Sequence, residues 1–341
     1  MKLFNLKKDN GFMKHRWLIG IVAILMLGTG FDAQAQRVEK YAGEFMAIDV
    51  SARAQALGGA FSALSNDVYA AFYNPAGLVQ VRSTQLGFTH TQQFLASVNY
   101  DYIGFARPLS SSKTLGISLV RLGVDNIKDS RSAAILDADG VLQGIDESRV
   151  NNFNSADYVF YLSMGHQFNS AFSIGFNVKL IRRSLADFSA NGLGFDAGLL
   201  YAVSDRWKIA GAVRNITTTL IAWDTGTKEL VSPTLRMGSS YLIPLPGLNS
   251  YFIPNFDVIV QSQNTPNLSE NGLDGGIFGG AIGGEFAIQE RLFLRGGYDE
   301  LQRLNLGIGI RIPHIGIDYA FTNYDQELGN AHRIGLLIDF E

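Results

Sequence analysis

The sequence contains no cysteine, and only 17% of its 341 residues are charged. Without cysteine the chain can form no disulfide, and it offers no thiolate as a nucleophile or metal ligand. Downstream of the first 35 residues it also lacks any apolar run near the roughly 18 residues typical of a membrane-spanning helix. This downstream part carries 23 Lys and Arg against 29 Asp and Glu. Such a mildly acidic balance argues against nucleic acid as a partner, because phosphate binding needs a basic surface.

The first 35 residues have the pattern of a secretory signal peptide. Five basic side chains precede an apolar run of 11 residues, Trp17 to Leu27, and the small-residue sequence A-Q-A follows at 33–35. The alternative, a transmembrane helix, would need about 20 apolar residues. We therefore expect residues 1–35 to be a signal peptide that is removed at export.

From residue 84 onward, apolar residues alternate with small or polar ones, which is the pattern of β-strands. In residues 172–180 (FSIGFNVKL), one face carries Phe, Ile, Phe, Val and Leu, and the other carries Ser, Gly, Asn and Lys. Tilted strands need about 9–11 residues to cross a bilayer, whereas soluble strands are typically about 5–6. The predicted strands are mostly of the longer kind, at 84–93, 97–107, 113–124, 156–168, 171–183, 193–203, 206–216, 234–243, 251–262, 276–287, 291–299, 304–312, 315–323 and 332–340.

The predicted connections alternate between tight turns and longer polar loops. The tight ones lie at 108–112, 169–170, 204–205, 289–290 and 313–314, with a longer member at 243–250. The polar ones lie at 125–155, 184–192, 217–233, 263–275 and 324–331, with short members at 94–96 and 300–303. Outer-membrane barrels have short periplasmic turns, long external loops and an even strand number.

These patterns predict an all-β fold, a fourteen-stranded antiparallel transmembrane β-barrel at 84–341. A soluble sandwich is disfavoured, because the face opposite the bulky residues is small and glycine-rich rather than full of charges. Barrel closure also satisfies every backbone donor within the membrane. We expect a location in the bacterial outer membrane, with lipid around the bulky face and both termini in the periplasm.

Residues 36–83, between the signal peptide and the first strand, are helical in character. Residues 51–57 end at Gly58, which is a helix C-cap signal. A second short helix is expected at 68–73, and Pro75 would end it, because proline disfavours helical geometry in the residue before it. Small side chains on these helices would let them fit inside a wide lumen, so we expect a short N-terminal hatch there.

The stretch "SARAQALGGAFSALSNDVYAAFYNPAGL", residues 51–78, resembles the N-terminal motif of the PorV/PorQ proteins, which are outer-membrane barrels related to the FadL fatty-acid transporters. The family pattern is A-R-A-x-A-x-G-G-A, then an Asn/Asp-Asp pair, then N-P-A-G-L. The residues that carry the match most distinctively are Arg53, Gly58, Gly59, Asn66, Asp67, Asn74, Pro75 and Gly77.

The resemblance implies a hatch inside the barrel and a part in type IX protein secretion. Such barrels bind secreted cargo or other secretion components at their external loops, for which 125–155 and 217–233 are the candidates here. The relation to FadL implies an alternative, a transporter of hydrophobic small molecules such as fatty acids. That function would require an apolar pocket and an opening in the wall, expected near the glycines at 279–280 or 296–297. A purely structural barrel is a third possibility.

Charged residues on the predicted inner face are few and of mixed sign. They are Lys179, Asp196, Arg214, Asp257, Arg295, Asp318, Arg333 and Asp339. Mixed signs favour a salt-bridged network between wall and hatch, which Arg53 could join, over a polar lining for a solute. The last strand, ending at Phe340 before Glu341, is similar to the C-terminal signal read by the barrel-assembly machinery.

No motif predicts enzymatic chemistry. Ser110-x-x-Lys113 lacks the partner motifs of penicillin-recognising enzymes. Residues 137–142 lack the glycine required at the sixth position of a calcium loop, which leaves at most a weak surface site. The histidines have no metal-ligand spacing. We therefore expect no enzyme activity, no cofactor and no metal.

Overall fold

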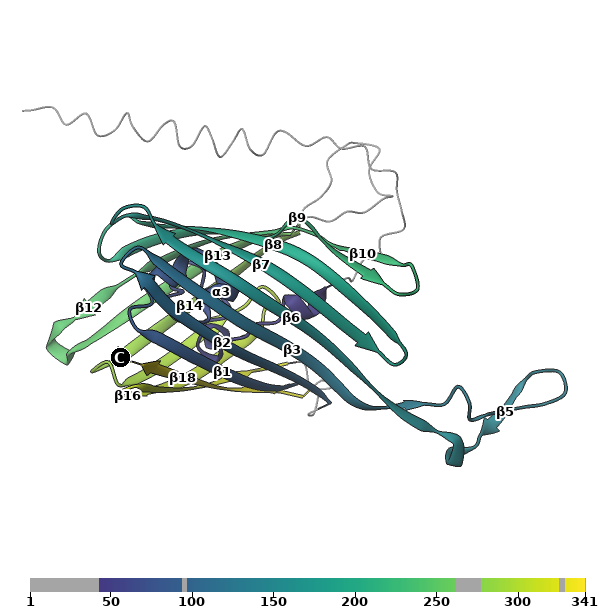
Figure 1. The fold of residues 1–341 in the computed structure, drawn as a ribbon. Coiled ribbons are helices and arrows are strands. Elements are labelled where there is room, and N and C mark those ends of the chain that lie inside the picture. The colour runs from purple at the N-terminus through teal and green to yellow at the C-terminus, as the bar shows by residue number, and fades with distance from the viewer. Residues whose placement is uncertain (1–42, 94–96, 262–276, 325–328, 341) are drawn as a thin grey trace, which may run out of the picture. The chain divides into compact units, whose positions relative to one another are not determined.

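The structure, a computed structural model, describes residues 43–93, 97–261, 277–324 and 329–340. The predicted signal peptide and the predicted loop at 263–275 lie outside these residues. Within these residues, four short helical segments precede the first strand: η2 (Glu44–Met46), α2 (Ala52–Ala56), α3 (Ala70–Tyr73) and η3 (Pro75–Gln80) (Figure 1). None of the helices in the described ranges is long and apolar enough to span a bilayer.

Fourteen strands of the described residues form one closed antiparallel ring. Each pairs with its neighbours in chain order, and the ring closes where β1 pairs with β18. They are β1 (Thr84–Gln93), β2 (Val98–Ser110), β3 (Lys113–Asp129), β6 (Asn151–Gln167), β7 (Phe172–Leu185), β8 (Phe188–Ala202), β9 (Trp207–Trp223), β11 (Thr234–Tyr241), β13 (Ser250–Gln261), β14 (Ile277–Ile288), β15 (Leu292–Tyr298), β16 (Leu304–Ile312), β17 (Ile315–Thr322) and β18 (Ala331–Phe340). The prediction of a closed fourteen-stranded antiparallel barrel is confirmed, and closure leaves the ring without an unpaired edge.

The two faces of the wall differ in the sense that the alternating sequence predicts. On β7, the apolar side chains of Phe176, Val178 and Leu180 are 56%, 38% and 53% exposed. Asn177 and Lys179, which alternate with them, are buried. The bulky face therefore points away from the interior, which is the reverse of a soluble sheet protein.

Several predicted loops are wrong, because the strands run past the end of their apolar alternation. The predicted loop at 184–192 is a two-residue turn between β7 and β8, with Ala186 at φ +50°. β9 continues to Trp223 and is followed by β10 (Lys228–Val231), which pairs with it. These extensions mix polar and apolar residues, as in Thr219 and Leu220 of β9, and so lack the clean alternation of the predicted strands. The backbone ladder nevertheless continues, because backbone hydrogen bonds do not depend on side-chain polarity.

The largest predicted loop, 125–155, also contains regular structure. β3 and β6 extend into it, and a bulge at residues 124–127 places Asn126 at φ +59°. Beyond them lie a hairpin of β4 (Ala134–Leu136) and β5 (Leu142–Ile145), then η4 (Glu147–Arg149). In Figure 1 this hairpin lies at the far end of the β3–β6 ladder. At the opposite ends of the strands, β12 (Ile243–Leu245) and η5 (Pro246–Leu248) occupy the predicted 243–250 connection.

The N-terminal segment, residues 43–83, packs against the ring at two places. α2 contacts β15, β16, β17 and β18, and η3 contacts β3, β6, β7 and β8. The predicted end of α2 is confirmed: Gly58 and Gly59 follow its C-cap with φ values of +66° and +79°. The predicted second helix begins two residues late, because Asp67 turns the chain by accepting a hydrogen bond from the Tyr69 amide at 3.1 Å.

Candidate functional site

Arg53 of α2 joins the N-terminal segment to the wall. Its Nε and Nη2 donate hydrogen bonds to the two carboxylate oxygens of Glu285 on β14, at 2.7 and 2.8 Å. Its Nη1 donates to Asn66 at 2.7 Å and to Asp67 at 3.3 Å. Bidentate pairs of this kind are directional as well as strong. Arg53, Asn66 and Asp67 of the motif at residues 51–78 therefore come together at one point.

A chain of alternating charges continues from Glu285 along the inner face of the wall. Arg295 Nε lies 2.7 Å from Glu285, and its Nη1 lies 2.7 Å from Asp318. Arg311 closes the chain at 2.7 Å from the second oxygen of Asp318. Every charge in it faces an opposite one, which is the condition for burying ionic groups without a large cost.

Burial and pairing act in opposite directions on the titration of the segment's charged groups. Burial lowers the pKa of Arg53, but the charge and hydrogen bonds of Glu285 together with the charges of Asp67 and Asp318 outweigh burial, so the pKa is raised. Burial raises the pKa of the Asp67 carboxyl, and Arg53 offsets only part of this increase. Both groups are thus held by their partners in a site with little water.

Further hydrogen bonds, outside this chain of ion pairs, hold the same part of the segment. The backbone N and Oγ of Ser62 both donate to Asp257 of β13, at 3.2 and 2.5 Å. Gln55 of α2 donates to Asn305 of β16 at 2.7 Å and accepts a hydrogen bond from Arg333 of β18 at 2.6 Å. α2 and the turn after it are therefore held by polar side chains that reach in from the wall.

A second buried ion pair lies on the β7–β9 side. Lys179 Nζ lies 2.6 Å from Asp196, and neither side chain is exposed by more than 2%. Asp196 also accepts hydrogen bonds from the Asn177 side chain at 3.0 Å and the Asn215 backbone at 2.9 Å. Asn177 in turn donates to the Ala71 carbonyl at 2.7 Å, which ties this pair to α3.

The remaining predicted inner charges are placed in separate surroundings rather than in one continuous network. Arg214 donates to the Met46 carbonyl and lies over the Phe72 ring, with 4.2 Å from its guanidinium carbon to the ring centroid. Arg333 donates to Thr91 and Gln55, and Asp339 accepts from Ser83 and Gln85. Phe340 is 46% exposed on the outward face of the last strand.

Sequence reasoning missed several partners in these clusters. Glu285 was not among the predicted inner residues, although it alternates with Gly283 and Ala287 on the buried side of β14. Arg183, which lies 2.9 Å from Asp157 and 2.8 Å from Glu229, was also missed. The same two-residue alternation that selected Lys179 and Asp318 would have identified Glu285.

The N-P-A-G part of the motif contacts the wall through backbone rather than charge. A side chain added at Gly175 of β7 would overlap the Pro75–Ala76 peptide, and one at Gly198 of β8 would overlap Asn74. Asn74 donates to the Ser62 carbonyl at 3.0 Å and the Leu199 carbonyl at 3.1 Å. Glycines in the wall therefore make room for η3.

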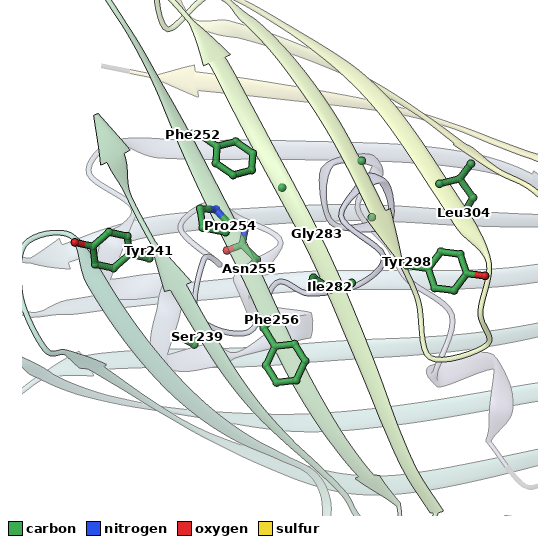
Figure 2. Close-up of a pocket in the computed structure, with 13 residues that line it drawn as sticks. Ser239, Tyr241, Phe252, Pro254, Asn255, Phe256, Ile282, Gly283, Tyr298 and Leu304 are labelled. Atoms are coloured by element: carbon green, nitrogen blue, oxygen red, sulfur yellow. The ribbon is translucent and has the colours of Figure 1, made fainter. Parts of the chain in front are cut away.

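A groove of about 620 Å³ lies on the outward face of β11, β13, β14 and β15 (Figure 2). Tyr241, Phe252, Phe256, Ile282 and Tyr298 line it with large apolar surfaces. Its floor contains four glycines at facing positions of β14 and β15: Gly283 opposite Gly297, and Gly284 opposite Gly296.

The wall beneath this groove is a single layer of backbone. A side chain added at Gly283 or Gly297 would overlap the backbone of Leu57, the C-cap of α2. One added at Gly58 would lie 2.6 Å from the Tyr298 carbonyl oxygen. The turn that ends α2 thus lies directly behind the glycines that form the groove floor.

No group of three or more side chains within the described residues has the arrangement of a metal site. At the predicted calcium-like turn, Asp137 accepts hydrogen bonds from the amides of Asp139 and Val141, at 3.0 and 2.8 Å. This is the geometry of an ordinary Asx turn.

Comparison with known proteins gives a fold. No protein-family profile matches the chain, and no curated protein sequence is significantly similar to it. The toluene transporter TbuX of Ralstonia pickettii is 14% identical over 84% of this chain and 97% of its own, with a TM-score of 0.53. The Pseudomonas putida toluene transporter TodX is 13% identical over 85% of this chain and 97% of its own, with a TM-score of 0.55. A Pseudomonas aeruginosa FadL homologue is 12% identical over 84% of this chain and 96% of its own, with a TM-score of 0.50. The TM-scores establish a shared barrel fold, and at identities this low they establish the fold alone.

Proposed function

We propose that the protein is an outer-membrane channel for hydrophobic small molecules, with residues 43–83 as a hatch in its lumen. The exposed apolar face of the ring supports the membrane location, since lipid is the solvent that such a face requires. The similar barrels of known structure include two described as toluene transporters and one FadL homologue. The channel reading replaces the secretion role as the leading interpretation.

The contacts of residues 43–83 support the proposed hatch. α2 and η3 touch strands on different sides of the ring, and the residues that meet them, including Glu285, Lys179 and Gly175, lie on the buried face of the wall. Arg53, Asn74 and Pro75 then serve to seat the hatch. Tight seating of this kind blocks a polar leak through a wide lumen.

The observation that carries the proposal is the apolar groove with the hatch turn behind its floor. On one side of the glycine quartet lies an aromatic surface facing lipid, and on the other lies the Leu57–Gly58 turn. A displacement of that turn would leave only the β14–β15 ladder between lumen and groove. We propose this place as the point where an apolar solute passes the wall.

Uptake measurements test this function. Cells that lack their own channel for long-chain fatty acids or toluene should take up the labelled compound when they express this protein. Gly296→Leu should reduce uptake severalfold, because the nearest atom to an added Cβ is 3.7 Å away and the side chain would fill the groove. Gly211→Leu is the matched control, since no atom lies within 4 Å of an added Cβ on β9. Equal uptake by cells with and without the protein would refute the channel.

The secretion role implied by the PorV/PorQ resemblance stays a second candidate, because the external hairpin exposes an apolar face. Leu136 pairs with Leu142, and Ala134 pairs with Ile145, so all four lie on one face of β4–β5. Leu136, Leu142 and Ile145 are 57%, 59% and 52% exposed. An isolated two-stranded hairpin gains little stability in water, so a protein partner would stabilise it.

A binding assay separates the two candidates. Under the secretion reading, Leu136→Ser/Leu142→Ser should abolish capture of a secreted cargo protein and leave solute uptake unchanged. Under the channel reading, the Gly296→Leu variant loses uptake and keeps any cargo binding. Capture that is equal for the wild type and the hairpin variant would remove the case for cargo contact at this hairpin.

A further inference from the structure

A row of polar side chains crosses the outward face of six neighbouring strands. The residues face one another in consecutive registers of β1, β2, β3, β6, β7 and β8. They are His90, Asp101, Arg121, Tyr158, Arg182 and Asn191. Adjacent strands lie about 4.8 Å apart, so the row is a continuous strip rather than a set of isolated residues.

The strip marks a sharp boundary on the wall. On the side of the strip toward the turns at 108–112, 169–170 and 204–205, the next outward residue of each strand is apolar and 36–53% exposed. These residues are Phe88, Ile103, Leu119, Phe160, Leu180 and Leu193. The outward residues on the other side of the strip are small or polar: Gln92, Asn99, Gly123, Ala156, Ser184 and Ser189. The change from apolar to polar therefore falls at one register on all six strands.

The charges within the strip leave two guanidinium groups facing outward. The carboxylate of Asp101 is engaged by His90 Nδ1 at 2.6 Å and by Arg121 Nη1 at 3.4 Å. Arg182 donates one hydrogen bond to Asn191 at 3.0 Å and has no carboxylate partner among the described residues. Arg121 and Arg182 stand on either side of Tyr158, so they are separated by two strand spacings, about 10 Å.

We propose that this strip binds the phosphate groups of anionic membrane lipids, through Arg121 and Arg182. The inference rests on the membrane location in the proposed function. A charged side chain that faces lipid is costly in the hydrocarbon layer but tolerated at the level of the headgroups. The apolar row ends next to the strip, which places the strip at the headgroup level. Arginine binds phosphate oxygens in a bidentate manner, and tyrosine at the same level has the amphipathic character of a membrane-interface residue.

The single carboxylate in the strip does not prevent this binding. Asp101 is 28% exposed and lies between two donors, His90 and Arg121, which reduce its effective charge toward a ligand. The strip as a whole carries two Arg against one Asp. Arg121 and Arg182 are about 10 Å apart, which is wider than a single phosphate group. A lipid with two phosphates could therefore use both Arg side chains.

Native mass spectrometry of the purified barrel in zwitterionic micelles tests the proposal, with lipid A as the probe. The wild-type protein should retain bound lipid A, and Arg121→Gln/Arg182→Gln should bind it at least about tenfold more weakly, because each charge-assisted hydrogen bond contributes about that factor. The matched control is Arg107→Gln/Lys113→Gln, which removes two exposed cations at the turn ends of β2 and β3. This control should bind as the wild type does.

The outcomes are distinguishable from failure of the channel. Migration of unheated protein on a denaturing gel reports whether each variant is a folded barrel, and insertion into vesicles reports the membrane location. A wild-type protein that inserts, together with an Arg121→Gln/Arg182→Gln variant that keeps lipid A, would overturn the inference alone. Displacement of lipid A by 10 mM inorganic phosphate, about the level used in buffers, would also overturn it by indicating a soluble ligand. Failure of the wild type to insert would refute the membrane location itself.

Discussion

The two ends of the N-terminal segment are held to the wall by different physical means. The α2 end is held by side chains with several rotatable bonds: Arg53 on Glu285, Gln55 on Asn305, and Ser62 on Asp257. The η3 end is seated by backbone against glycines, with the Pro75–Ala76 peptide against Gly175. Backbone also lies against glycines at the α2 end, where Leu57 meets Gly283 and Gly297, so the ion pairs of Arg53 are what distinguish this end. We expect the α2 end to be the half that moves during transport, because its terminal turn lies behind the glycines that line the groove.

The charge cluster at the α2 end should be the most sensitive point of the molecule. Glu285→Ala leaves Arg53 and Arg295 buried without their shared carboxylate, so the free energy of unfolding should fall by about 3–5 kcal/mol. Urea titration in detergent measures it. The control Glu147→Ala removes a carboxylate from the exposed η4 and should change stability by less than about 0.5 kcal/mol. Equal stability of the two variants would mean that the cluster does not hold the segment.

The socket at the η3 end should respond to added volume rather than to lost charge. Gly175→Ala forces a methyl group against the Pro75–Ala76 peptide and should cost about 1–3 kcal/mol, measured in the same titration. Gly211→Ala, with no neighbour within 4 Å of the new methyl, is its control and should be nearly neutral. A Gly175→Ala variant as stable as this control would show that η3 is loosely seated.

Much of the fold follows from the two-residue period of the sequence, and the limits of that signal are physical. The predicted bounds of β16 coincide with the observed strand, because its outward face is apolar from end to end. Those of β1 coincide as well, although only Leu86 and Phe88 are apolar on its outward face. β7 ends at Leu185 and β8 begins at Phe188, beyond the predicted bounds of 183 and 193. In this region Arg182 and Asn191 interrupt the apolar face, so the sequence no longer distinguishes the two faces of the strand. Alternation identifies a strand only where one of its two faces is apolar.

The site was less predictable from sequence than the wall. The two-residue alternation alone places Lys179 and Asp318 on the inner face. Which charges form ion pairs depends on which strands are neighbours and in which register, as for Glu285 with Arg295. The contact between Arg53 and Glu285 joins residues 232 positions apart. Of the two glycine pairs near which a pocket was expected, Gly296–Gly297 lines the groove and Gly279–Gly280 does not. The part played by Gly283 and Gly284 could not be predicted, because it depends on the register in which β14 meets β15.

The smallest expected effect is a pH dependence at the α2 end. The folded pKa of Asp67 is raised above its ordinary value, so the folded state holds this proton more tightly than the unfolded state does. Its contribution to stability is therefore fully present below the unfolded pKa, near 3.8, and is lost as pH rises through the folded pKa. Asp67→Asn should flatten the fall in unfolding free energy over that interval, measured by urea titration at a series of pH values. An unchanged slope would assign the pH dependence to other groups.

The movement of one end against the other can be tested with disulfides, since the native chain has no cysteine to interfere. A Cβ added at Gly335 of β18 lies 3.5 Å from the Ala52 Cβ, within the range of about 3.5–4.5 Å that a disulfide requires. The pair Ala52→Cys/Gly335→Cys would lock the α2 end. At the η3 end, a Cβ added at Gly165 lies 3.1 Å from the Leu78 Cβ. This is about 0.4 Å below that range, so Leu78→Cys/Gly165→Cys is a matched lock that requires a small outward shift of η3 to form.

Solute uptake by these two locked variants, before and after addition of a reductant, is the most direct test of the account. Oxidised Ala52→Cys/Gly335→Cys should lose uptake and regain it on reduction, whereas oxidised Leu78→Cys/Gly165→Cys should transport as the wild type does. Unimpaired uptake with the α2 end locked, or loss of uptake only with the η3 end locked, would contradict the account.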